Sequence, residues 1–176
     1  MSQKYLNTII AIGLIVGAVM LRLLPHPANF APIAAVAIFG GAMLPRKLAL
    51  WVPLSAMMIS DMVIGFYNIM LVIWGCYALI ALASSLWLRK PNFRRGATLT
   101  VSASVFFFIV TNFAVWAAGG MYAHTWTGLI QCYNMALPFF RNTVLSDAFY
   151  AASLFGLYAL ARMAAVKLFK PVTQES

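Results

Sequence analysis

The chain has 176 residues, of which 64% are hydrophobic and only 9% are charged. Soluble domains carry about 25% charged residues, so this composition excludes a water-soluble globular fold and a disordered chain. The formal net charge of +9 does not indicate nucleic-acid binding, because orientation in a membrane gives positive charge another role.

Apolar stretches follow one another along the chain, and Pro, Gly or clustered basic residues interrupt them. A spanning helix needs about 20 apolar residues, and Pro and Gly end helices for steric reasons. We therefore expect an all-α integral membrane protein, a six-transmembrane-helix bundle that forms a single domain over residues 1–176. The expected spans are residues 5–24, 31–44, 48–66, 69–88, 97–118 and 142–164.

The second stretch is short for a crossing, so a re-entrant segment is the alternative. Basic residues gather on the cytoplasmic side of membrane proteins, and a re-entrant segment would move Arg46 and Lys47 outside. With six crossings and both the N-terminus and the C-terminus cytoplasmic, only Arg22 and Arg141 lie outside. Ten of the twelve basic residues then lie inside: Lys4, Arg46, Lys47, Arg89, Lys90, Arg94, Arg95, Arg162, Lys167 and Lys170.

This topology places the unusual polar residues of the spans toward the outer face. Ionisable groups in spanning segments are costly, and they mark either function or a structural pair. The structural alternative is that Asp61 or Asp147 pairs with Arg22 or Arg141. The gathering of many polar groups on one side favours a binding cavity. The candidate ligand-binding residues are His26, Asp61, Cys76, Tyr77, Asn112 and Arg141.

Residues 119–140 form a stretch of aromatic, amide and apolar residues that is longer than an ordinary loop. We expect an outer, lid-like segment, with mobile ends at Gly119, Gly120 and Gly128. Trp and Tyr also suit the membrane interface, so an interfacial belt is the alternative.

Cys76 and Cys132 both fall in the outer half, where the compartment is expected to be oxidising. They could form a disulfide, or they could be two buried inert thiols. Cys76 could also be a soft ligand for a transition metal held in a cofactor. No Cys/His spacing forms a protein-only zinc site, and no nucleophile-elbow or P-loop signature is present in the sequence.

Several short segments resemble a family of small bacterial six-helix membrane proteins. In size and topology the chain is similar to the substrate-binding S-components of energy-coupling factor (ECF) vitamin transporters, and within that group to the BtuM-type cobalamin transporters. The segments are LPHPANFAP at 24–32, FGGA at 39–42, Ser60-Asp61, TNF at 111–113 and LPFFRNT at 137–143.

The resemblance implies a multi-pass protein of the bacterial cytoplasmic (inner) membrane that takes up a vitamin from an outward-open cavity. It implies cobalamin as the ligand, no intrinsic cofactor, and Cys76 as the ligand to cobalt, near His26 and Asp61. Cys76 would be catalytic only if it removed cyanide from cobalamin. The implied partners are the lipid bilayer and an energy-coupling membrane subunit with its ATPases.

The leading hypothesis is therefore a vitamin-binding transport protein and not an enzyme. Uptake of another small metabolite, with the cysteine purely structural, is the first alternative. The others are a thiol-dependent membrane enzyme that uses Cys76 or an Asp61/His26 pair, and a scaffold subunit with no ligand.

Overall fold

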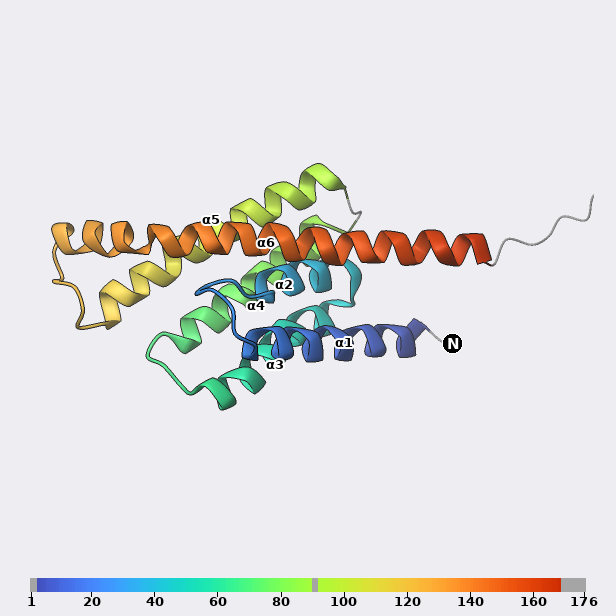
Figure 1. Cartoon of the computed structure of the whole chain (residues 1–176), viewed down its shortest axis with the longest axis horizontal. Coiled ribbons are helices and arrows are strands. Elements are labelled where there is room, and N and C mark those ends of the chain that lie inside the picture. The colour runs from blue at the N-terminus through green and yellow to red at the C-terminus, as the bar shows by residue number, and fades with distance from the viewer. Residues whose placement is uncertain (1–2, 90–91, 169–176) are drawn as a thin grey trace, which may run out of the picture.

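The computed structural model describes residues 3–89 and 92–168, and all of its regular secondary structure there is helical (Figure 1). The helices are α1 (Gln3–Leu23), α2 (Ile33–Met43), α3 (Arg46–Ile64), α4 (Met70–Trp87), α5 (Phe93–Ala118) and α6 (Trp126–Leu168). All except α2 are long and apolar enough to cross a membrane. The first five follow the expected spans closely, whereas the sixth does not.

Helix α2 is the central helix of the bundle, and it packs on each of the other five. Residues 33–41 are all buried. A helix that is apolar all round needs such an environment. Its 11 residues are about 16 Å long, roughly half the hydrocarbon thickness.

Close packing of α2 on α4 depends on small residues. A Cβ atom at Gly41 would lie only 2.5 Å from the Cβ of Ser84. The Ser84 hydroxyl donates a hydrogen bond to the Ile38 carbonyl at 2.6 Å. Elsewhere the core is rich in Ala and Ser, while many large apolar side chains face outward. Small residues inside and large apolar residues outside are typical of helices packed in lipid.

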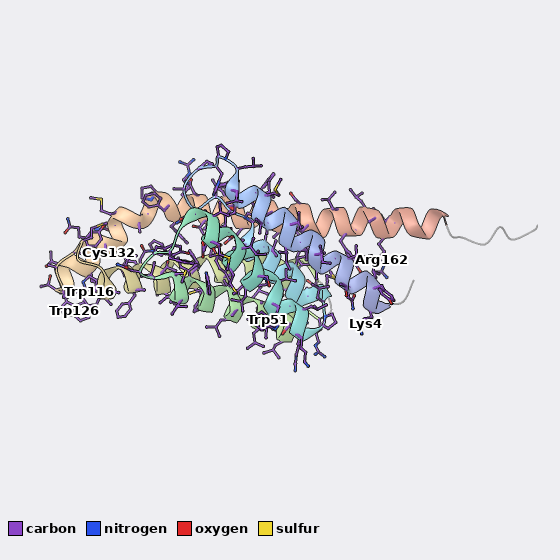
Figure 2. All side chains as sticks on the ribbon, turned by 90° about the horizontal axis from the view of Figure 1, so that it is seen from below. Lys4, Trp51, Trp116, Trp126, Cys132 and Arg162 are labelled. Atoms are coloured by element: carbon purple, nitrogen blue, oxygen red, sulfur yellow. The ribbon has the colours of Figure 1, made fainter. Side chains whose placement is uncertain are left out.

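The described ends of the helices gather at two opposite ends of the bundle (Figure 2). Lys4 and Arg162 lie toward one end, and Trp116, Trp126 and Cys132 lie at the other (Figure 2). One surface hollow brings together the start of α1, the α2–α3 turn and the end of α4, so Arg46 and Arg89 share an end. Helix α2 therefore runs from one end of the bundle toward the other, which does not fit a re-entrant segment that returns to the same end. Among the basic residues expected inside, Lys90 and Lys170 lie outside the described residues, as does the side chain of Lys167.

Residues 119–140, where we expected a lid-like segment, are mostly helical. Helix α6 begins at Trp126 and continues for 43 residues, so only residues 119–125 form a loop, and the expected span at 142–164 is part of a longer helix. Pro138 lies inside α6 and does not end it. Proline is tolerated within membrane helices because neighbouring groups satisfy the freed carbonyl.

The short loop before α6 is held in place by hydrogen bonds. The Trp116 indole donates to the Ala123 carbonyl at 2.9 Å, and the Thr125 hydroxyl accepts from the Gly128 N–H at 3.1 Å. The start of α6 also packs on α5, where Tyr133 donates to the Ile109 carbonyl at 2.7 Å. The expected glycine hinges therefore belong to a helix end, a short loop and the first turn of a helix.

Candidate functional site

A buried ion pair joins the end of α1 to the last turn of α3. Nη1 of Arg22 lies 2.6 Å from Oδ1 of Asp61, and the Asp61 side chain is fully buried. Nη1 also donates a hydrogen bond to the Ser60 hydroxyl. The sequence left open which acid would pair with which arginine, and the structure selects Arg22 and Asp61.

The second oxygen of Asp61 is fixed by two aromatic donors. The Trp74 indole N–H donates to Oδ2 at 2.7 Å, and the Tyr67 hydroxyl donates to it at 3.4 Å. Burial raises the pKa of the Tyr67 phenol, and the nearby Asp61 carboxylate raises it further. Tyr67, in the α3–α4 loop, therefore stays protonated and available as a donor.

A cavity of about 300 Å³ opens beside this ion pair. The cavity is enclosed by the end of α1, by the loop that follows α1 and by the facing sides of the other helices. Two hydrogen bonds join the α1–α2 loop to α6, one from Asn142 to the Ala28 carbonyl at 3.0 Å and one from Ser146 to the Ala31 carbonyl at 2.9 Å. The lining residues are Arg22, His26, Asn29, Ala31, Ile33, Ala34, Met57, Ile64, Tyr67, Ile73, Tyr77, Phe107, Thr143 and Asp147.

Asp147 supplies a second buried carboxylate to the same cavity. It lies in α6, is 3% exposed, and its Oδ2 accepts a hydrogen bond from the Ser104 hydroxyl of α5 at 2.6 Å. Among the described residues it has no cationic partner, because the ion pair there joins Arg22 to Asp61. The cavity is thus bordered by one neutralised ion pair and one carboxylate without a counter-ion.

Aromatic rings form one wall of the cavity. Tyr77 of α4 and Phe107 of α5 stack, with centroids 5.1 Å apart and an interplanar angle of 25°, and both line the cavity. Tyr67 of the α3–α4 loop adds a third ring. The site therefore combines polar groups that fix orientation with apolar and aromatic surface, which is typical of small-molecule pockets.

The structure places three of the six candidate residues at this site. His26 and Tyr77 line the cavity. Asp61 does not line it, but it forms an ion pair with Arg22, which does. The exposed His26 contacts the Leu24 carbonyl through Nδ1 at 2.6 Å.

The other three candidates lie elsewhere. Arg141 is exposed and Asn112 donates to the Phe108 carbonyl at 2.8 Å, and neither lines the cavity. Cys76 is 2% exposed and is likewise absent from the lining.

Both cysteines are free and buried, so the thiol alternative to a disulfide is confirmed. Cys132 donates through its sulfur to the Asn112 carbonyl at 3.4 Å. Within residues 3–89 and 92–168, no group of three or more His, Cys, Asp or Glu residues is placed to hold a metal ion.

Several site residues were missed or left unassigned in the sequence. Arg22 and Asp147 were visible as intramembrane charges, but nothing in the sequence indicated that one cavity holds both. Phe107, Thr143 and Ser104 gave no signal, because an apolar ring or a hydroxyl in a spanning helix is ordinary.

A second hollow, of about 380 Å³, lies at the opposite end of the bundle. Its charged residues are Arg46 and Arg89, which are exposed, and Arg89 donates to the Ser85 carbonyl at 3.2 Å. Exposed arginines at a helix end are expected from the charge asymmetry alone. Among the described residues, a buried charged side chain lines the smaller cavity and none lines the larger hollow. The smaller cavity is therefore the candidate functional site.

The chain belongs to DUF6580, a family of unknown function, whose family model matches residues 2–170. No curated protein and no solved structure matches the chain.

Proposed function

We propose that this protein binds a small polar solute in the outer cavity and takes it up across the membrane. The observation that carries the proposal is the cavity between the helices, which Arg22 and Asp147 border inside an apolar bundle. Ionisable residues at such positions mark substrate pathways in transporters. A scaffold role would need no cavity with charged residues on its wall, and a thiol-dependent enzyme is not favoured because Cys76 does not line the cavity.

The proposed orientation follows from the charges. The end that carries Lys4 and Arg162 is cytoplasmic, with both termini inside, and the cavity near Arg22 and His26 opens outward. The protein is then a six-crossing protein of the bacterial cytoplasmic membrane. Uptake driven by ATP would need the energy-coupling subunit and ATPases that the resemblance implies, because this chain has no P-loop.

The geometry supports a small metabolite better than cobalamin. A volume of about 300 Å³ is at the lower limit for sites of drug-sized ligands, roughly 300–1,000 Å³, and a corrinoid is much larger than such ligands. Cys76 is buried among packed side chains and does not face the cavity. The role of Cys76 as a cobalt ligand therefore has no support from this arrangement, and a structural role for its thiol fits better.

Copurification tests this proposal directly. Protein is isolated in lipid nanodiscs, and bound small molecules are identified by mass spectrometry. In Ala31→Leu, a larger side chain enters the cavity from its wall. The matched control is Ala42→Leu, which changes the hollow at the other end. We expect the bound solute to be lost in Ala31→Leu and kept in Ala42→Leu. The same solutes in both variants, or none in the native protein, would refute the proposal.

A further inference from the structure

The charges around the cavity do not balance. Arg22 and Asp61 neutralise each other at 2.6 Å, which leaves Asp147 as a buried carboxylate without a cation among the described residues. A charge in an apolar bundle is expensive unless something pairs with it. Unless Asp147 carries a proton, its partner must come from the cavity that it lines.

One oxygen of Asp147 is positioned and the other is unused. Ser104 donates to Oδ2 at 2.6 Å, which orients the carboxylate from the α5 side. Oδ1 accepts no hydrogen bond from the described residues. A carboxylate oxygen can accept more than one hydrogen bond, so Asp147 can bind a donor that enters the cavity.

The aromatic wall favours a particular kind of donor. The stacked pair of Tyr77 and Phe107, together with Tyr67, lines the same cavity as Asp147. Aromatic faces attract cations through the ring quadrupole, and such rings are used to recognise quaternary ammonium groups. Tyr77 lines this cavity together with both of its charged groups, Arg22 and Asp147.

We propose that the solute carries an organic cation, a protonated amine or a methylated ammonium, and that Asp147 is its counter-ion. The inference rests on the proposed function, since it names the class of solute for the same cavity. Arg22 does not oppose it, because Asp61 already neutralises the guanidinium. The competing arrangement is a proton on Asp147, which would leave the cavity without a preference for cations.

A reactive thiol in the cavity wall measures this preference without knowledge of the solute. Thr143 lies one helical turn before Asp147 and lines the cavity. Thr143→Cys is reacted from outside with methanethiosulfonates that carry a trimethylammonium, a sulfonate or no charge. Each rate is divided by the rate of the same reagent with a small thiol in solution. Cys76 and Cys132 are each 2% exposed, so the unsubstituted protein serves as the blank.

We expect the cationic reagent to react faster than the anionic one by on the order of tenfold or more, as a partly buried unit charge implies. Asp147→Asn keeps the shape and removes the charge, so the ratio should fall to about one. Ser153→Ala keeps the carboxylate and is the matched control, in which the preference should persist, because Ser153 lies on the same helix, outside the cavity lining, and donates to the Phe149 carbonyl. Both substitutions are made in the Thr143→Cys protein.

Equal normalised rates for the two charged reagents in the Asp147 protein would overturn the inference, whether or not Asp147→Asn folds. A ratio that Asp147→Asn leaves unchanged would overturn it too. Both results leave solute binding in the Ala31→Leu experiment intact, so the inference can fail alone. If even the neutral reagent fails to modify Thr143→Cys, the cavity is closed to the outside, and the proposed function fails with it.

Discussion

The Arg22–Asp61 ion pair gives the sharpest test of how the bundle is held together. Asp61→Asn leaves the guanidinium of Arg22 beside neutral groups in an apolar interior. Arg22→Met leaves the carboxylate of Asp61 with two donors, from Trp74 at 2.7 Å and Tyr67 at 3.4 Å. The double variant removes both charges and keeps an amide oxygen as acceptor for the Trp74 indole.

The expected free energies of unfolding follow from what each variant leaves unpaired. Removing one partner of a buried pair costs about 3–5 kcal/mol. The Arg22 side chain is 13% exposed, so we expect the lower end, about 3 kcal/mol, for Asp61→Asn. We expect about 2 kcal/mol for Arg22→Met, because two hydrogen bonds still stabilise the carboxylate. The double variant should lose only about 1 kcal/mol, whereas independent effects would give about 5 kcal/mol.

The two buried thiols provide the assay. Cys76 and Cys132 become reactive toward a fluorogenic thiol dye only when the bundle opens. Unfolding is measured by dye reaction across an SDS titration in mixed micelles for the native protein, both single variants and the double variant. A loss under about 0.5 kcal/mol in Asp61→Asn, or a double variant equal to the sum of the singles, would show that the pair does not stabilise the fold as argued.

Three further predictions follow from other parts of the bundle. Gly41→Ala should lower the free energy of unfolding by about 1–3 kcal/mol, because the new Cβ would lie 2.5 Å from the Cβ of Ser84. Gly75→Ala is the control: no atom lies within 4 Å of its new Cβ, so it should be neutral or slightly stabilising in the same SDS titration. Cys76→Ser should leave solute copurification unchanged, and added cyanocobalamin should show the same visible spectrum with the native and variant proteins; a spectral shift that Cys76→Ser abolishes would restore the cobalamin hypothesis. Reporter fusions should give cytoplasmic signals after Lys47, Arg95 and Lys170 and external signals after Asn29, Asn68 and His124, and an external C-terminus would contradict the topology.

The sequence alone determined the class of fold and the places of the first five helices. Helix α3 was expected at 48–66 and lies at Arg46–Ile64, and α4 was expected at 69–88 and lies at Met70–Trp87. These boundaries were readable because insertion into a membrane depends on summed hydropathy over about 20 residues. Such a sum can be read locally, before anything is known of packing.

The start of helix α6 was not predicted from the sequence, because Pro138 and the polar residues near it are typical of a break between helices. Whether a proline ends a membrane helix depends on the neighbouring groups that pack against it. In this chain the start of α6 packs on α5, where Phe108 lies 4.6 Å from Phe140 between ring centroids. That support comes from a neighbouring helix and is invisible in the local sequence.

The composition of the site was decided by how each helix is rotated. Successive residues of a helix point about 100° apart, so Tyr77 lines the cavity while its neighbour Cys76 does not. The sequence showed that Asp61 and Asp147 are costly charges in apolar helices, and nothing more about their partners. Only the tertiary structure showed that Asp61 pairs with Arg22 and that Asp147 lines the cavity. Which side chains meet depends on the orientation of each helix, and packing across the whole bundle sets these orientations.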